Sequence, residues 1–442
     1  MGSFLLETAG RVLAGLVEVN VRALTSRTAW ASLSGTTFPR NGARAYATEM
    51  GGGADEMYVG AYTPITKKLW VERASKRATA APAEPTGEGR PPKHVSVTYN
   101  FSTDRTLHEM YRNPWGHLRL GRLLEDLDSL AGNVAFEHCH TGRGPPLLVT
   151  ASVDEIAVRH PLLVDRDIVV RGQVVWTGKS SLDIRMQLFQ AHHAPDPSLE
   201  ALFSFVHLDP ATGKGAPVAP LRPQSAADVE TFRQRQAVAD ARRAARQQKQ
   251  AQGDSGGGGG GGEPHAVPPE AREWVRAARR LRELPALAAS DCVLMPSTCQ
   301  HNTFICQPQN RNTSGRIFGG FLMRRAYELA FATTYMFGGV RPTFHKVEEI
   351  TFSRPVDVGD LLRLTSTVVH AAHLDEQRER ARVVVEVEAR VTKPEAVDSF
   401  VTNTFTFVYE LRARPGGPPL PLKRVLPTCE EEALRCWRAR QL

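Results

Sequence analysis

The segment VDEIAVRHP at residues 153–161 returns further along the chain as VEEITFSRP at residues 347–355. The first, third, fourth and ninth positions of the two segments are identical, and an alternating run of apolar and polar residues follows each one. Self-similarity at a fixed offset is the sequence signature of a duplicated structural unit. The repeat therefore predicts two copies of one domain in this chain of 442 residues.

The repeat extends in both directions from these segments. Gly121 is matched to Gly319 before them, and after them Phe203, Phe205 and Val206 are matched to Phe405, Phe407 and Val408. A hydrophobic content of 41% is enough to fill two cores of ordinary size. We therefore expect two domains, with equivalent elements in the same order.

Each copy has one extended segment, one long helix and then about four strands. The extended segments are 94–101 and 292–306, and the helices are 122–140 and 321–336. A single helix with one apolar side buries that side best against the concave face of a curled antiparallel sheet. We therefore expect an α+β fold, a tandem double hotdog in which each copy wraps a curled antiparallel sheet around one long helix. The copies are expected to pair strand edge to strand edge. Alternating apolar positions mark the strands: Leu182, Ile184, Met186 and Leu188 in copy one, and Val383, Val385, Val387, Ala389 and Val391 in copy two.

Breaks in composition divide the chain. The first 46 residues hold five arginines and only two acids, and RAYA at residues 44–47 looks like a matrix processing site. We expect import into the mitochondrial matrix, with a plastid address or an unaddressed tail as alternatives. The linker contains basic helical stretches and seven glycines at 256–262. The predicted divisions are a transit peptide (1–46), a flexible lead (47–92), hotdog domain 1 (93–221), a linker (222–288), hotdog domain 2 (289–414) and a C-terminal tail (415–442).

Composition argues against several functional classes. The six cysteines form no CxxC pair, so we expect reduced thiols and no metal site. No window approaches the roughly 20 apolar residues of a membrane span. The net charge of +8 and the basic linker suggest RNA as a partner, but the linker lacks interleaved aromatic residues. We expect solvated helix faces there and no specific nucleic-acid partner; RNA binding remains a rival interpretation that predicts a steep salt dependence.

Asp128 is the main candidate for catalysis in the first helix. Leu124 lies four positions before it and Ala131 three positions after it, so the carboxylate falls within the apolar stripe. Burial of an unpaired carboxylate costs several kcal/mol, and such a group suits general-base attack by water. The alternative is an acid at the edge of the stripe that reaches solvent or pairs with an arginine.

The segment NTSGRIFGG at residues 312–320 precedes the second helix. Gly319 and Gly320 allow a substrate to approach the backbone, whose free N–H groups can bind a developing oxyanion. Asn312 can orient a water molecule or hold a reacting carbonyl, or it caps a turn. Glu328 has Arg324 and Arg325 one turn before it, so an ion pair is the first interpretation and catalysis the second. The turn formed by Gly178, Lys179, Ser180 and Ser181 can meet phosphate or be a plain hairpin turn.

These motifs resemble the acyl-coenzyme A thioesterase 9 type, the mitochondrial double-hotdog thioesterases with plant and algal relatives. The resemblance covers about residues 93–412 apart from the linker, whose glycine run departs from the family. It implies hydrolysis of acyl-CoA without metal or redox cofactor, at a site between two hotdog units, and assembly into homo-oligomers. It rests on GRLLEDLDSLA (121–131), GRIFGGFLMRRAYELA (315–330), WTGKSS (176–181) and RPVDVGD (354–360).

The resemblance implies an Asn before one helix and an acid on the other, which Asn312 and Asp128 match. We expect Gly320 N–H to polarise the thioester carbonyl, Asp128 to take a proton from water, and Asn312 to position that water. Direct attack by Asp128 to form an anhydride is also allowed. Gly319 and the turn with Lys179, Ser180 and Ser181 would bind the substrate, the turn through the coenzyme A phosphates.

A second, symmetry-related site would need an Asn before the first helix. The segment NPWGHLR at residues 113–119 fits that requirement poorly, which leaves Glu328 without a clear partner and predicts one competent site. Two rivals remain. A catalytically silent acyl-CoA-binding sensor or scaffold shares the fold. Hotdog dehydratases and hydratases need a histidine beside the acid, and His138 and His140 lie about three turns from Asp128.

Overall fold

The computed structural model describes residues 89–442 apart from 141–145, 155, 194, 252–266 and 313–314. All described residues fall within one compact unit of the chain. The predicted transit peptide, nearly all of the predicted lead, and the seven glycines of the linker lie outside the described residues.

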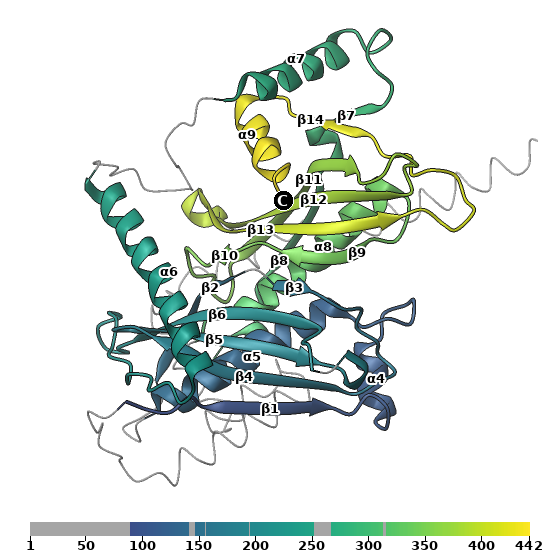
Figure 1. Cartoon of the computed structure of the whole chain (residues 1–442). Coiled ribbons are helices and arrows are strands. Elements are labelled where there is room, and N and C mark those ends of the chain that lie inside the picture. Colours follow the sequence, from purple (N-terminus) through teal and green to yellow (C-terminus); the bar gives the residue numbers. More distant parts are fainter. Residues whose placement is uncertain (1–88, 141–145, 155, 194, 252–266, 313–314) are drawn as a thin grey trace, which may run out of the picture. The chain divides into compact units, whose positions relative to one another are not determined.

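The first copy of the repeat is a hotdog unit in which a sheet packs against one long helix (Figure 1). The helix α5 begins at Leu120 and ends at Cys139, close to the predicted bounds. Its leucines recur at helical spacing and all are buried, which is why this stretch forms the centre of the core. The elements are β1 (His94–Tyr99), α4 (Arg105–Tyr111), α5 (Leu120–Cys139), β2 (Leu147–Val153), β3 (Ile156–Val158), β4 (Ile168–Thr177), β5 (Ser181–Phe189), a 3-10 turn η2 (Ala191–His193) and β6 (Leu199–Leu208).

The second copy repeats the order of one long helix followed by strands, and its last three strands are longer than those of the first copy. Its helix α8 ends where Gly339 adopts a left-handed conformation, with φ 67°, that favours glycine. The elements are β7 (Cys292–Leu294), η3 (Met295–Thr298), β8 (Gln300–Ile305), η4 (Pro308–Asn310), α8 (Gly319–Gly338), β9 (Thr343–Val347), β10 (Ile350–Thr351), β11 (Leu361–His373), β12 (Arg380–Lys393), η5 (Pro394–Ala396) and β13 (Asp398–Arg412).

The two copies join into one antiparallel sheet of twelve strands. Its main order is β1-β4-β5-β6-β3-β9-β13-β12-β11-β8, and from each edge inward the strands β1-β4-β5-β6 match β8-β11-β12-β13. At the junction Ile156 pairs with Val347, and Val153 pairs with Ile350. The two segments that predicted the duplication therefore pair reciprocally with each other, and the expected edge-to-edge pairing is confirmed.

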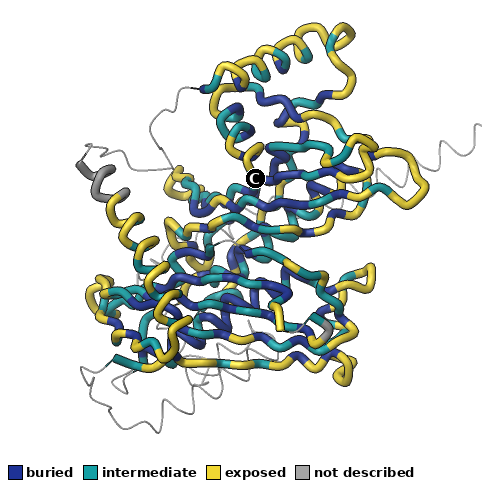
Figure 2. The backbone as a smooth tube through the Cα atoms, in the orientation of Figure 1, coloured by how far each residue is buried: buried dark blue, intermediate teal, exposed yellow. Residues whose placement is uncertain are grey.

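The two long helices lie against each other on the inner face of this sheet. Figure 2 shows the burial concentrated along them and the strands that they contact. Polar residues of α5 are buried as well: Asp126 is 1% exposed and accepts hydrogen bonds from the hydroxyls of Tyr99 and Tyr111. Contact with both the sheet and α8 leaves α5 little surface for water.

The strand pairing and the helix starts each correct one detail of the predicted repeat. Val153 pairs with Phe203, whereas its equivalent Val347 pairs with Phe407, so Phe203 corresponds to Phe407 and not to Phe405. The slip is two residues, which keeps each side chain on the same face and leaves the alternating pattern unchanged. Gly121 corresponds to Gly320 and not to Gly319, because each is the second residue of its helix.

The predicted linker contains a helix that docks on the outer face of the first copy. In α6 (Ala226–Ala251), Gln236 accepts a hydrogen bond from Trp176 Nε1 at 2.9 Å. Arg235 lies 2.8 Å from the buried carboxylate of Asp183 and 2.8 Å from Asp154. The expectation of solvated helix faces is therefore wrong for this side of α6, because polar strand residues supply specific partners.

The end of the linker and the C-terminal tail pack together on the second copy. The helix α7 (Pro269–Glu283) contacts α9 (Glu430–Ala439), where the tilted rings of Trp274 and Trp437 pack with centroids 6.0 Å apart. The strand β14 (Arg424–Leu426) pairs in parallel with β7. Among the described residues, no helix is long and apolar enough to cross a membrane.

Candidate active site

Asp128 lies where the two long helices meet, with only 1% of its surface exposed. Its Oδ2 accepts a hydrogen bond of 2.6 Å from the backbone N–H of Gly320, the second residue of α8. Its Oδ1 accepts a hydrogen bond of 3.0 Å from the hydroxyl of Thr150 in β2. A carboxylate of the first copy is thus held by the helix N-terminus of the second, whose partial positive charge favours an anion.

The pKa of Asp128 is raised from 3.8 to about 6. Burial is the largest cause, because it disfavours the charged form. The hydrogen bonds from Thr150 and Gly320 lower the pKa in part, and the nearby charge of Glu125 raises it. The group is consequently ionised at neutral pH and can accept a proton near pH 6, as a general base requires.

Gly319 and Gly320 allow the two helices to approach this closely. A Cβ on Gly320 would lie 2.9 Å from the carbonyl oxygen of Glu125 and 3.0 Å from Asp128 Cβ. A Cβ on Gly319 would lie 3.2 Å from Asp128 Oδ2 and 3.2 Å from the ring of Phe352. The two glycines therefore give the carboxylate access to the start of α8.

Asn312 lies in the loop that leads into α8. Its backbone N–H donates to Arg316 O at 2.6 Å, and its Oδ1 accepts from Arg316 N–H at 3.2 Å. Gly315 closes the turn with φ 83°, a left-handed conformation that favours glycine. This loop reaches the site through Phe318, which directly precedes Gly319.

Comparison with known proteins identifies the family. The chain is 42% identical over 391 residues to acyl-coenzyme A thioesterase 4, mitochondrial, of Humulus lupulus, covering 84% of this chain and 72% of that protein. The chain belongs to the acyl-coenzyme A thioesterases. Its identity to the human acyl-coenzyme A thioesterase 9, mitochondrial, is 34% over 332 residues, 73% of each chain.

The chain is also similar to two further proteins. The identity to acyl-coenzyme A thioesterase 2, chloroplastic, of Humulus lupulus is 39%, covering 85% of this chain and 87% of that protein. A putative oleoyl thioesterase from Lactobacillus plantarum aligns with a TM-score of 0.40 at 9% identity, covering 73% of this chain and 98% of that structure. No protein-family model matches the chain.

Thr150 is a partner of Asp128 in the candidate site of this thioesterase that sequence reasoning missed. It lies on β2 next to an irregularity in the pairing with β6, and its neighbours along the strand carry ordinary β-forming side chains. A threonine in a strand gives no signal of its own, because strands favour threonine for its shape. Only the register of β2 and its position facing α5 identify this hydroxyl as a partner of Asp128.

The pseudo-symmetric position in the second copy carries different chemistry. Counting from the helix starts, Tyr327 corresponds to Asp128. Counting from the strand junction, Phe344 corresponds to Thr150. These two rings pack edge to face with centroids 5.5 Å apart, and a Cβ on Gly121 would lie 3.0 Å from Tyr327. An aromatic pair thus replaces the carboxylate and hydroxyl pair.

The loop before α5 does match the loop of Asn312, which corrects the expectation from sequence. Asn113 N–H donates to His117 O at 2.8 Å, and Asn113 Oδ1 accepts from His117 N–H at 3.0 Å. Gly116 has φ 81°, close to the value of Gly315. The two turns have the same geometry although the residues between Asn and Gly differ, because the turn depends on an Asn and a Gly three residues apart.

Glu328 has cationic partners on both helices. It accepts from Arg324 at 3.1 Å, from Arg325 at 3.4 Å, and from Arg119 at the start of α5 at 3.0 Å. Burial alone would raise its pKa, but Arg324 and Arg119 outweigh burial and lower it. The acid is therefore held as a carboxylate in an ion-pair network, and any catalytic role for it stays a prediction.

The predicted phosphate turn lies across the sheet from Thr150. Thr150 pairs with Phe205, Phe205 with Leu182, and Leu182 with Thr177 at the start of the turn. Strands lie about 4.8 Å apart, so the backbone of Thr177, two residues before Lys179, is on the order of 15 Å from that of Thr150. The side chain of Lys179 is exposed.

Proposed function

We propose that this protein hydrolyses fatty acyl-CoA thioesters to free acid and coenzyme A with water activated by Asp128. The observation that supports this proposal is the buried carboxylate held between Thr150 and the start of α8, with its pKa raised to about 6. Such a group accepts a proton from water at neutral pH, and the coenzyme A thiolate leaves readily. The balanced reaction adds water across the C–S bond and releases acid and thiol.

The start of α8 supplies donors for the oxyanion. Gly320 N–H is engaged by Asp128, whereas Gly319 N–H has no acceptor among the described residues. When Asp128 takes the proton, its neutral form accepts more weakly and Gly320 N–H is released toward the carbonyl oxygen. We assign the oxyanion to both amides, the water to Asn312, and no catalytic step to Glu328. Direct attack by Asp128, forming an anhydride, is the competing route.

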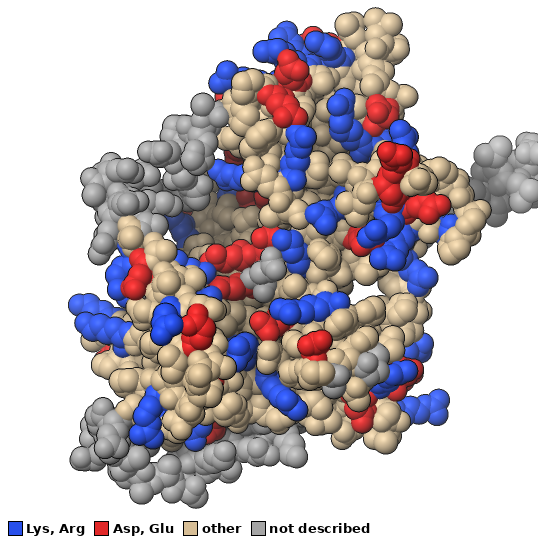
Figure 3. Space-filling model, in the orientation of Figure 1, with Lys and Arg blue, Asp and Glu red and all other residues tan. Residues whose placement is uncertain are grey.

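Substrate binding and cellular setting complete the proposal. Lys179, Ser180 and Ser181 hold coenzyme A phosphates, at a distance that a pantetheine arm can span. The relatives are named mitochondrial or chloroplastic, so we place this thioesterase in an organelle, the mitochondrial matrix in the first instance. On the face shown in Figure 3, basic and acidic side chains are interspersed, which disfavours a nucleic-acid stripe. We further propose a homo-oligomer of double-hotdog units.

The test is thiol release from acyl-CoAs of increasing chain length. The unmodified protein should turn over, and Asp128→Asn and Asn312→Ala should each lose about a hundredfold or more in kcat. Lys179→Gln should raise KM and leave kcat unchanged. Tight acyl-CoA binding without thiol release would instead identify a silent sensor or scaffold and remove the catalytic roles.

Labelling with ¹⁸O distinguishes direct attack by water from attack by Asp128. A single turnover in H₂¹⁸O places the label in the fatty acid if water attacks directly. An anhydride at Asp128 opens at the aspartyl carbon or the acyl carbon, and attack at the former leaves label in the protein. Label in Asp128 would therefore overturn the general-base route.

A further inference from the structure

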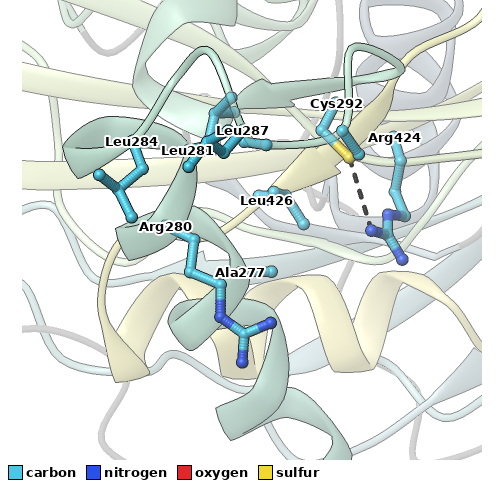
Figure 4. Close-up of a pocket in the computed structure, with 10 residues that line it drawn as sticks. Ala277, Arg280, Leu281, Leu284, Leu287, Cys292, Arg424 and Leu426 are labelled. Carbon is cyan, nitrogen blue, oxygen red and sulfur yellow. Dashed lines mark hydrogen bonds between the residues drawn. The ribbon is translucent and has the colours of Figure 1, made fainter.

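A concave site lies away from Asp128, between α7, β7 and β14 (Figure 4). Its volume is about 270 Å³. Four leucines form much of its lining: Leu281, Leu284, Leu287 and Leu426. The three segments meet there because β14 of the C-terminal tail pairs with β7, and α7 covers that pair.

The apolar wall of this cavity is open to water. Leu284 is 55% exposed and Leu287 is 83% exposed. Singly exposed leucines are ordinary on a protein surface, but two on the wall of one concave site form an apolar contact surface. Covering them is favourable by roughly 25 cal/mol for each Å² removed from water.

Two cations accompany the leucines. Neither Arg280 nor Arg424 forms an ion pair with a described residue; Arg424 Nη2 donates to Cys292 Sγ at 3.5 Å, as the dashed line in Figure 4 marks. The neighbouring Arg279 is paired with Glu283 at 2.8 Å, so the carboxylate of Glu283 on α7 forms its ion pair with Arg279. Asp291, which accepts from the Cys292 thiol at 3.4 Å, is the acid beside the cavity. The lining itself contains cations and no carboxylate.

We propose that this cavity binds an aliphatic carboxylate, a fatty acid anion of medium chain length. The alkyl chain covers the leucine wall, and the carboxylate lies at the rim between the guanidinium groups of Arg280 and Arg424. Arginine recognises carboxylates through paired N–H groups, which a neutral thiol acceptor leaves available. The volume is near the lower end of small-ligand pockets, about 300 Å³, and is too small for a whole acyl-CoA. The enzyme's product belongs to this class if the proposed function holds, but the lining argues for the ligand independently.

The experiment is equilibrium dialysis of the full chain with radiolabelled decanoate. If the proposed function holds, the acyl site at Asp128 also binds fatty acids, so the readout is the number and affinity of binding sites per chain. Arg424→Gln and Leu284→Glu change exposed side chains of the cavity and should weaken one class of site by about tenfold or more. Matched controls outside the cavity are Arg279→Gln on the same helix and Leu374→Glu, another exposed leucine. The neutral analogue decanol should occupy the same site more weakly.

The outcomes separate cleanly. The proposal is supported if both cavity variants lose that class of site, both controls retain it, and all four keep the kcat/KM for acyl-CoA of the unmodified protein. Decanoate binding that is unchanged in the cavity variants overturns it. Binding to phosphatidylcholine vesicles that depends on Leu284, without binding of free decanoate, would assign the surface to a membrane instead and also overturn it. Absence of hydrolysis would remove the proposed function and leave this result intact.

Discussion

At the scale of a single residue, the proposed function predicts that Asp128 sets the pH dependence of the reaction. Its pKa of about 6 reflects burial, partly offset by Thr150 and Gly320. A general base must be ionised, so kcat/KM should rise about tenfold for each pH unit below 6 and level off above it. The measurement is a pH profile of kcat/KM between pH 4.5 and 8.5. An acid limb centred near pH 4 would show that another group or an exposed Asp128 governs activity.

The buried carboxylate of Asp128 should lower the free energy of unfolding of the protein. An acid whose pKa is raised on folding destabilises the native state as pH rises through the interval from 3.8 to about 6. The full effect is on the order of 3 kcal/mol, at 1.36 kcal/mol for each pKa unit. We therefore expect Asp128→Asn to be inactive and to gain stability relative to the unmodified protein between pH 4 and pH 7. Urea titrations at pH 4 and pH 7 give the free energy of unfolding of both proteins. If the variant exceeds the unmodified protein by the same amount at both pH values, the expectation is contradicted.

Thr150 should act through Asp128. Thr150→Val keeps the shape and removes the hydroxyl, so the carboxylate loses one stabilising hydrogen bond. We expect kcat to fall by about tenfold to a hundredfold and the acid limb of the pH profile to move upward, because the ionised form is less favoured. Thr150→Ser restores the donor and serves as the control. A loss of activity in the Val variant without movement of the acid limb would indicate a packing effect.

The sequence identifies part of this site. Asp128 is visible because an acid interrupts an apolar helical stripe, and Gly320 because a glycine pair opens a helix. Thr150 is invisible because its role depends on which strand position faces α5. That facing depends on a register set by an irregular pairing between β2 and β6, which no local pattern reports.

At the scale of the elements, charged residues on the two long helices affect the pKa of Asp128. Arg324 of α8 lies 2.8 Å from Glu125 and 3.1 Å from Glu328, and Glu125 lies one turn before Asp128. The charge of Glu125 raises the pKa of Asp128, and Arg324 opposes that charge. We expect Arg324→Gln to move the acid limb of the pH profile upward by about half a unit and Glu125→Gln to move it downward.

A double variant is the control for this pair. Replacing both charges should leave the acid limb close to that of the unmodified protein, since the two effects oppose each other. Equal shifts in the same direction for both single variants would show that a rearranged helix contact, and not charge, moves the pKa. Thermal unfolding of each variant separates the two cases.

Elements were predictable where the pattern was periodic. Both helices and the alternating faces of β5 and β12 follow from the sequence, because one buried face imposes a period on it. The match of Phe203 to Phe405 failed because a slip of two residues keeps every side chain on its face. The docking of α6 was missed because its contacts are polar: Gln236 and Arg235 look like solvent-facing residues until Trp176 and Asp183 are placed opposite them.

At the scale of the whole molecule, the two copies share the backbone geometry of the loop before each long helix. They differ in the side chain opposite that loop. The loops of Asn113 and Asn312 have the same hydrogen bonds, and Gly121 and Gly320 occupy the same helix position. The side chains opposite these loops differ: Asp128 stands in one copy and Tyr327 in the other. A single chain therefore offers two pseudo-equivalent positions, which serve as controls for each other.

This pairing gives a decisive comparison between two asparagines. Asn312 belongs to the loop that enters the helix contacting Asp128, whereas Asn113 belongs to the loop that enters the helix facing Tyr327. Both substitutions to Ala remove the same hydrogen bond within the loop, to Arg316 and His117 respectively, so their effects on stability should be alike. If catalysis needs Asn312 at Asp128, Asn312→Ala should lose about a hundredfold in kcat while Asn113→Ala stays within about twofold. Comparable losses in both variants would mean that the loops act on the fold alone, or that both sites turn over. Titration with a slowly hydrolysed acyl-CoA separates these cases, since one working site binds one equivalent per chain and two sites bind two.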